Sequence, residues 1–429
     1  MSTRADMGAV TTSAAVTTSA AVTTSAAATI SAAAARLGAG PLTEPALRWH
    51  IDPLFTRVLA RPGHYFANHS LGRPPDRTFD DIARGMALWP DQLGDAWEPW
   101  LDAQNQFRAG VAQLAGVVRA DCIIPKTSAG QGLRTVLGLA DAKLRVLSTR
   151  GEFDSLDVIL RHYWARGRIE LKMVEPDARG WFATGELLHA LDAPVDLLVI
   201  SQVMFMTGQV MVDLAAIIAK AHAQGAKVLL DVYHSFGVLP VNLTALDVDF
   251  AVGGGYKYLR GGPGSGWLYV RPEIVDAGPA PLDTGWFAKH QPFTYQRPDP
   301  PRFAAGGDGF LESTPPVLVP YQSLAGLAFT QALGVERIRT YGLALAQRLV
   351  EALAAQGVDA EGGRAGMGAF VVLRHQRADQ LAAAISAAGV KCDARAQYLR
   401  LTPDVLTRPD EITIAATVVA TALERSQAG

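Results

Sequence analysis

An acid and an amine each follow a short apolar run in the middle of the chain. Asp231 follows the apolar residues 228–230, and Lys257 follows the apolar residues 250–252, three glycines and a tyrosine. Short apolar runs separated by helical segments are typical of buried parallel strands, whose carboxyl ends meet at one edge of a sheet. Pyridoxal phosphate needs an acid beside its ring nitrogen and an amine beside its aldehyde, so this pair predicts a site for that cofactor.

Lys257 is the residue expected to react. A lysine amine becomes a nucleophile toward an aldehyde when burial lowers its pKa. The glycines at 253–255 and 261–266 would let backbone and cofactor approach closely. A lysine before a glycine run is also compatible with an exposed loop. The run does not match a phosphate-binding P-loop, because none of its glycines is followed by Lys-Ser or Lys-Thr.

Asp231 ends a buried strand, so its charge needs a partner. A pyridinium N–H is such a partner, and the carboxylate would keep that nitrogen protonated. His234 lies three residues further on and is expected to brace Asp231 by a hydrogen bond. A helix N-cap for Asp231 and an ordinary buried histidine for His234 are the alternatives from these residues alone.

A possible phosphate site precedes the helical segment 133–140. Thr127 and Ser128 follow the apolar run 122–125 and stand where this helix would begin. Free backbone N–H groups and the helix dipole attract anions at such a position. Taken alone, the two hydroxyls are better explained by an ordinary N-cap.

Composition limits the classes of function. The 429 residues include 41 acidic and 39 basic side chains, for a net charge of -2, which gives no electrostatic case for nucleic acid or an anionic membrane. No apolar run approaches the ~20 residues of a membrane span. Cys122 and Cys392 are far apart and lack metal-ligand spacing, so no metal site is predicted and a reduced cytoplasm is expected.

The first forty residues differ from the rest. A six-residue repeat of small residues starts at Val10, Val16 and Val22. Such a segment has no bulky side chains with which to build a core, so 1–40 is predicted to be a disordered tail.

Three further regions are expected. Residues 41–100 read as an arm that lies on the body of the protein. Alternating strands and helices over 101–320 predict a large α/β domain with a mostly parallel sheet covered on both faces. Residues 321–429 predict a smaller α+β domain that starts with helices over 322–341 and 343–356.

From Tyr65 to the C-terminus, the order of several motifs resembles kynureninases, which belong to the class V aminotransferase group and to fold type I of the pyridoxal phosphate enzymes. That resemblance implies a mostly parallel, seven-stranded central sheet. The Asp-x-x-His and Tyr-Lys-Tyr pair is specific for the class, and Gly-Trp-Phe with Thr-Pro-Pro points to kynureninases. The motifs are 65–72, Thr127-Ser128, Thr207-Gly208-Gln209, Asp231-Val232-Tyr233-His234, Tyr256-Lys257-Tyr258, Gly285-Trp286-Phe287, Thr314-Pro315-Pro316 and Arg400-Leu401-Thr402-Pro403.

The resemblance implies a role for each matching residue on the cofactor side. Lys257 would form the imine with the cofactor, Asp231 would pair with the ring nitrogen, and His234 would support it. Phe153 would stack on the ring. The residues that would contact the phosphate region are Thr127, Ser128 and Tyr256, the last also counted with the catalytic residues.

Other matches concern the substrate and the neighbouring subunit. Arg400 would grip the substrate α-carboxylate, for which a bidentate guanidinium is suited. Asn68 and Ser70 would also bind substrate. Trp286 and Thr314 match positions that the family supplies from the neighbouring subunit, so the resemblance implies a homodimer with shared sites.

The chain departs from the family mainly on the substrate side. The family has an aspartate three residues after the stacking phenylalanine, where this chain has Leu156 followed by Asp157. The family's substrate-side histidine has no counterpart in the segment 89–97. Its Gly-Asn-Ser-Leu-Gly motif is Asn68-His69-Ser70-Leu71-Gly72 here. The cofactor therefore follows more firmly from the sequence than the substrate.

The expected reaction is hydrolytic Cβ–Cγ cleavage of kynurenine or a related amino acid to alanine and an aromatic acid. One alternative is a class V aminotransferase or another lyase on the same cofactor. Cys392 is not placed as the nucleophile of a cysteine desulfurase and is expected to be a small core residue. A cofactor-binding regulator without turnover is disfavoured, because it would not need Lys257, Asp231 and Arg400 together.

Overall fold

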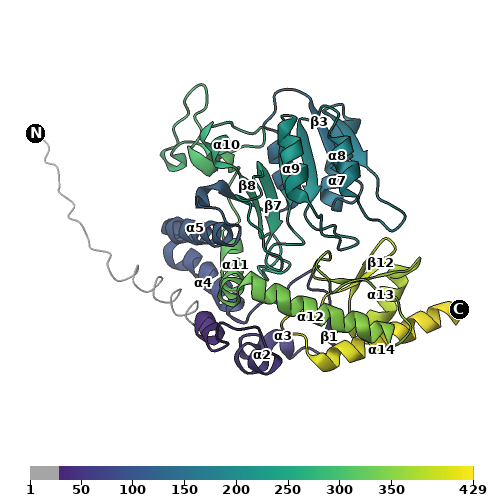
Figure 1. Cartoon of the computed structure of the whole chain (residues 1–429). Coiled ribbons are helices and arrows are strands. Elements are labelled where there is room, and N and C mark those ends of the chain that lie inside the picture. Colours follow the sequence, from purple (N-terminus) through teal and green to yellow (C-terminus); the bar gives the residue numbers. More distant parts are fainter. Residues whose placement is uncertain (1–28, 429) are drawn as a thin grey trace, which may run out of the picture.

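In this computed structural model, residues 29–428 are described. A seven-stranded sheet in the order β2-β8-β7-β6-β5-β3-β4 forms the centre of the larger part of the molecule. Its strands β3, β7 and β8 are labelled in the upper half of Figure 1. β8 runs antiparallel to both of its neighbours, and the other neighbouring pairs are parallel, as the sequence predicted. The strands are β2 (Ile123–Lys126), β3 (Leu144–Thr149), β4 (Ile169–Val174), β5 (Leu197–Ser201), β6 (Lys227–Asp231), β7 (Phe250–Gly254) and β8 (Gly266–Val270).

Helices cover this sheet and bury its central strands. α6 packs against α7, and α8 packs against α9. Every residue of β5, β7 and β8 is buried, as expected for strands covered on both faces. The helices of this part are α5 (Trp97–Leu114), α6 (Ala129–Leu137), α7 (Asp154–Ala165), α8 (Thr184–Ala190), α9 (Leu214–Ala223) and α10 (Pro272–Asp276), with 3-10 turns η3 (Ala120–Cys122), η4 (Trp286–Ala288), η5 (Pro292–Thr294) and η6 (Gly306–Phe310).

The C-terminal part has its own sheet and core. Its antiparallel strands lie in the order β11-β12-β9, and the short strand β1 pairs in parallel with β10. Helices α12, α13 and α14 pack beside these strands (Figure 1). The elements are β1 (His64–Tyr65), β9 (Val371–Arg374), β10 (Val390–Lys391), β11 (Asp393–Arg395), β12 (Tyr398–Leu401), α12 (Val335–Ala354), α13 (Ala378–Ala387) and α14 (Pro409–Ala428).

One predicted helix boundary is wrong. The chain breaks at Gly334, between α11 (Leu318–Leu333) and α12, rather than near Gly342. Gly334 has a φ of 83°, a conformation that glycine adopts without steric cost. Gly342 continues the helix, because Tyr341 before it and Leu345 and Leu349 after it pack against one apolar cluster at the spacing of an unbroken helix.

The N-terminal arm is anchored to α11. Residues 29–35 are helical, and Ile30, Ala33 and Ala34 share a buried apolar cluster with Phe55 and Phe329. The predicted disorder is therefore wrong for residues 29–40, because the spacing of Ile30 and the alanines gives one apolar helix face. Residues 1–28 of the predicted tail lie outside the described residues. The arm continues with α2 (Glu44–His50), η1 (Asp52–Leu54), α3 (Thr56–Leu59), α4 (Arg77–Gln92) and η2 (Leu93–Ala96).

Between residues 29 and 428, no helix has both the length and the apolar character needed to cross a bilayer.

Candidate active site

Lys257 lies in the loop after β7, at the carboxyl edge of the large sheet. Its side chain is buried, and its Nζ atom lies among three aromatic rings. The distances from Nζ to the ring centroids are 5.4 Å for Phe153 and 5.7 Å for both Tyr233 and Tyr256. An amine in such surroundings is shielded from water on several sides.

The charge of Lys257 is reduced by this burial. Burial lowers the pKa of the amine to about 7; the Asp231 carboxylate opposes this shift, and the Arg400 guanidinium adds to it. A substantial fraction of Lys257 is therefore neutral at neutral pH, which is the form that attacks an aldehyde.

His234 faces Lys257 rather than Asp231. Its Nε2 atom lies 2.5 Å from Lys257 Nζ, and burial followed by the Lys257 charge lowers the pKa of the imidazole well below its usual value. The neutral ring accepts a hydrogen bond from the amine through Nε2. The predicted hydrogen bond from His234 to Asp231 is wrong, because the imidazole points to the lysine; its buried Nδ1 has no partner among the described residues.

Asp231 ends β6 with its carboxylate buried. Oδ1 accepts the backbone N–H of Tyr233 at 2.8 Å. Burial raises the pKa of Asp231 to about 6, against the opposing effects of that N–H group and of Lys257. Among residues 29–428, no cationic side chain forms an ion pair with this carboxylate within 4.0 Å. A buried acid of this kind suits a ligand that brings its own N–H cation.

The α6 N-terminus has the features of an anion site. Ser128 caps the helix by accepting the Gln131 N–H at 3.2 Å, so the N-cap interpretation of this residue is correct. Thr127 donates its N–H and its hydroxyl to Gln131 Oε1 at 2.7 and 3.1 Å. A Cβ on Gly266 would lie 3.1 Å from the Ser128 nitrogen, so glycine leaves that N–H open. Thr127 and Ser128 are both exposed, as a phosphate cradle requires.

Two tyrosines connect this cradle with the lysine. The rings of Tyr233 and Tyr256 lie 5.7 Å apart, and the Tyr233 hydroxyl interacts with the backbone of Ala129 in the first turn of α6. Burial raises the pKa of Tyr256 to about 12, so its hydroxyl stays a hydrogen-bond donor. Sequence reasoning noted Tyr233 only as part of a motif and did not assign it to the site.

Phe153 stands at the start of α7, edge-on to Phe205 at 5.4 Å. Leu156, at the position of the family's aspartate, is fully buried in the large core. Asp157 accepts the Arg161 Nε–H at 2.9 Å one turn along the helix. The suggested replacement by Asp157 is therefore not supported by its contacts, which face along α7. A buried carboxyl in this turn, Glu152, was missed by sequence reasoning.

Arg400 lies on β12 with its guanidinium buried and already paired. Its Nε and Nη2 atoms donate to the two carboxylate oxygens of Asp393 at 2.9 and 2.8 Å, and Nη1 donates to the Phe205 carbonyl. Although burial raises the pKa of Asp393, hydrogen bonds from His69 and Arg400 hold it well below the usual range. When Arg400 binds a ligand, its Nε and Nη2 atoms are therefore already hydrogen-bonded to Asp393.

His69 completes this network. Its Nε2 atom lies 2.6 Å from Asp393 Oδ1, and its Nδ1 atom lies 2.5 Å from the Thr402 hydroxyl. Burial, with the nearby Arg400 charge, lowers the pKa of His69 to about 4, so the ring is neutral. Nε2 then donates to the ionised Asp393, and Nδ1 accepts from Thr402. The departure from the family motif at residues 68–72 was the one sequence signal of this network.

Asn68 and Ser70 flank His69 in a turn. Asn68 donates its Nδ2–H to the Thr402 carbonyl at 3.0 Å, while its buried Oδ1 has no partner among the described residues. The Ser70 N–H donates to the Ala67 carbonyl at 2.9 Å. Asn68 therefore serves the link between the turn and β12, and Ser70 shapes the turn.

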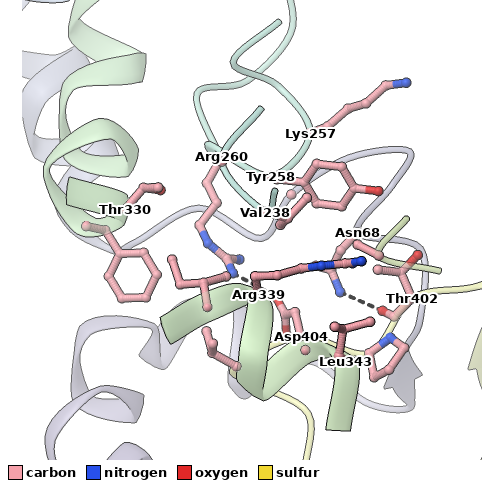
Figure 2. Close-up of a pocket in the computed structure, with 18 residues that line it drawn as sticks. Asn68, Val238, Lys257, Tyr258, Arg260, Thr330, Arg339, Leu343, Thr402 and Asp404 are labelled. Carbon is pink, nitrogen blue, oxygen red and sulfur yellow. Dashed lines mark hydrogen bonds and ion pairs between the residues drawn. The ribbon is translucent and has the colours of Figure 1, made fainter. Parts of the chain in front are cut away.

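The loop that carries Lys257 is tied to the C-terminal part (Figure 2). Arg260 donates to Asp404 Oδ2 at 2.7 Å and to the Arg73 carbonyl at 3.0 Å, and Arg73 also pairs with Asp404. The Gly72 N–H donates to the Tyr256 carbonyl at 2.9 Å. Figure 2 shows Arg260 and Asp404, with Lys257, among the residues that line a pocket. This pocket is a small cavity of about 30 Å³.

Trp286 and Thr314 lie together, away from these contacts. The Trp286 indole donates to the Thr314 hydroxyl at 3.1 Å, and its ring stacks on Tyr295. Neither residue is among the hydrogen-bond or ring partners of the Lys257 amine in the described part of the chain. Their assignment to a neighbouring subunit's site stays a prediction.

The donor set fits pyridoxal phosphate. It combines an amine with a lowered pKa, a buried acid without a bonded cation, an open helix N-terminus and an aromatic ring beside the amine. Residues 29–428 contain no group of three or more His, Cys, Asp or Glu side chains able to hold a metal ion.

Comparison with protein families matches residues 96–392 to the family described as aminotransferase class-V. Similar curated proteins are kynureninases, which agrees with the predicted resemblance. That of Bacillus cereus is 25% identical over 366 residues, covering 80% of this chain and 84% of that protein. That of Deinococcus radiodurans is 28% identical over 362 residues, covering 80% and 83%. That of Pseudomonas fluorescens is 28% identical over 304 residues, covering 67% and 70%.

Solved structures confirm the predicted fold. A mutant of C-DES with glycine covalently linked to the PLP cofactor superposes with a TM-score of 0.78 at 21% identity, covering 86% of this chain and 98% of that one. An apo cysteine desulfurase from Thermococcus onnurineus gives a TM-score of 0.74 at 18% identity, covering 85% and 95%.

Proposed function

Because this chain belongs to the class-V aminotransferase family and depends on pyridoxal 5'-phosphate, we propose that it hydrolyses the Cβ–Cγ bond of kynurenine or a related amino acid. The products would be alanine and an aromatic acid. One observation carries this proposal: the chain resembles kynureninases over most of their length, and it holds the reactive amine and a buried arginine in one site.

When bound, the cofactor supplies an aldehyde and a ring that accepts an electron pair. Lys257 would hold the aldehyde carbon, and Asp231 would keep the ring nitrogen protonated. Phe153 would cover one face of the ring. The phosphate would lie against residues whose donors converge at the start of α6, namely Thr127, Ser128 and Tyr256.

The proton transfers would fall to Lys257. Once the substrate has replaced it, the amine is free to take the α-proton, and a pKa near 7 suits a base that works at neutral pH. His234 accepts a hydrogen bond from Nζ and would orient the amine toward that proton. Arg400 would bind the α-carboxylate with the part of its fork that Asp393 leaves free.

A second candidate is an aminotransferase or a different lyase on the same cofactor. The segment 89–97 lacks the histidine that the kynureninase resemblance leads one to expect on the substrate side. A desulfurase mechanism is less favoured, because Cys392 is buried among core residues and burial raises the pKa of its thiol to about 12.

The reaction can be identified from its products. With purified, cofactor-loaded protein and kynurenine or 3-hydroxykynurenine, we expect equal amounts of alanine and the corresponding anthranilate, measured by chromatography and mass spectrometry. Formation of a keto acid instead would identify an aminotransferase. No product from either substrate, with activity on another amino acid, would overturn the proposed reaction while leaving the cofactor assignment intact.

We further infer a cytoplasmic location for the protein, because its two cysteines are buried and unpaired.

We also infer a homodimer in which Trp286 and Thr314 of one subunit serve the partner's site. If the sites are shared, Lys257→Ala and Trp286→Ala protomers are each inactive as homodimers. A mixed dimer has one site with both native residues, so mixing after mild dissociation should restore about a quarter of wild-type activity, since roughly half the dimers are mixed and one of their two sites is intact. No recovery, despite mixed dimers detected by native mass spectrometry, would show that the sites are not shared.

A further inference from the structure

Glu152 is a buried acid that the proposed reaction does not use. It lies in the turn between β3 and α7, directly before Phe153, and is 2% exposed. Its Oε1 accepts the Thr149 hydroxyl at 2.8 Å and the Ser201 N–H at 3.3 Å, and its Oε2 accepts the Ser201 hydroxyl at 2.5 Å. All three donors are uncharged, so the carboxyl is held in place without a bonded cation.

Ser201 connects Glu152 to Asp231. Ser201 at the end of β5 lies opposite Asp231 at the end of β6, and neighbouring strands lie roughly 4.8 Å apart. Two buried carboxyls thus stand at one edge of the sheet, on either side of a serine. Burial raises the pKa of Glu152 to about 7; the hydrogen bonds from Ser201 and Thr149 oppose this shift, and the Asp231 charge adds to it.

The charged groups near Glu152 do not neutralise it. The Asp231 charge at the end of β6 acts on Glu152 with the same sign, and the Lys257 charge acts on Asp231. The remaining charges on adjoining segments have other partners or are exposed. They are Arg150, which pairs with Glu175, Asp157, which pairs with Arg161, and Asp154, which is exposed at the start of α7.

We propose that Glu152 is a positioning residue for the cofactor ring. Glu152 and Asp231 form an acidic pair, and a cationic ring nitrogen stabilises the ionised form of this pair. Glu152 acts through Ser201, whose hydroxyl proton it holds, and it fixes the turn that presents Phe153 to the ring. The inference rests on the pyridoxal phosphate assignment and not on the identity of the substrate, so it stands or falls independently of the proposed reaction.

The test compares cofactor affinity in Glu152→Gln and wild-type protein at several pH values. Below the pKa of Glu152 both proteins carry a neutral group there, so their affinities should agree at pH 5.5. At pH 8 only the wild type has the second negative charge, so the variant should bind pyridoxal phosphate about tenfold more weakly, the equivalent of one pKa unit. Taking the ratio of the two Kd values cancels the titration of the cofactor itself.

Apo protein titrated with pyridoxal phosphate, followed by tryptophan fluorescence, gives these Kd values without any substrate. Glu175→Gln, an exposed acid on the neighbouring segment, is the matched control and should keep a ratio of one at every pH. Ser201→Ala provides a second variant: it removes one donor to the carboxyl, so the rise in affinity should move to higher pH. A ratio that does not change with pH, whether one or larger, would overturn the proposal, because a purely structural role predicts a constant loss.

Discussion

Lys257→Ala is expected to lower kcat by at least about a thousandfold and to remove the visible absorbance of the cofactor-loaded protein. The amine is both the covalent anchor of the cofactor and the base within reach of the substrate α-carbon. No other lysine among the described residues has a buried amine beside Asp231 and Phe153, so none would replace it. The measurements are the absorbance spectrum after addition of pyridoxal phosphate and the rate of product formation.

A matched control separates loss of the amine from general damage. Lys391 lies on the short strand β10 and is exposed, so Lys391→Ala should keep both the spectrum and the activity. An unchanged spectrum in Lys257→Ala would contradict the assignment of Lys257 as the anchor. A lost spectrum with retained activity would contradict its role as the base.

Arg400→Ala is expected to lower kcat/KM by about a hundredfold or more and to destabilise the fold by about 3 kcal/mol. The guanidinium supplies the bidentate partner of Asp393, and its removal leaves a largely buried carboxylate with His69 and the half-exposed Arg395 as its remaining partners. The substrate carboxylate would lose its cation at the same time. Urea unfolding and steady-state kinetics measure the two losses separately.

The double variant Asp393→Asn with Arg400→Ala distinguishes these two effects. It should recover most of the lost stability, since no uncompensated charge remains, and should recover none of the activity. Arg395→Ala is the control: its guanidinium is half-exposed and lies 3.5 Å from the same carboxylate, so it should cost less than about 1 kcal/mol. Recovery of activity in the double variant would show that Arg400 serves only to balance Asp393.

The cofactor side could be predicted from sequence because its residues follow strands with strong local patterns. β6 and β7 contain the apolar runs 228–230 and 250–252, and Asp231 and the loop that follows Gly254 reach the same edge by the rules of parallel sheets. The Asp231 and Lys257 positions follow from that topology alone. The N-cap at Ser128 is likewise a local signal, since one hydroxyl and one helix start define it.

The substrate side could not be predicted in the same way, because its contacts join distant segments. His69 and Asp393 are 324 positions apart, and the run 64–72 gives no sign that its histidine will meet an aspartate of a C-terminal hairpin. Glu152 was missed for a related reason: its burial depends on β5 lying beside β3. The helix of residues 29–35 could not be predicted from its composition, because alanines surround it and Ile30 is its single bulky apolar anchor.

The two ion pairs that Asp404 forms with Arg73 and Arg260 have a consequence for substrate size. Arg73 and Arg260 bind the same carboxylate, so the turn after β12, the lysine loop and the segment after β1 form one unit. This unit therefore holds Lys257 and Arg400 at a fixed distance from each other. Variants selected for longer or bulkier amino acids should consequently carry their substitutions where the side chain of the substrate extends. They should not carry them in Arg73, Arg260 or Asp404, which set the distance between Lys257 and Arg400.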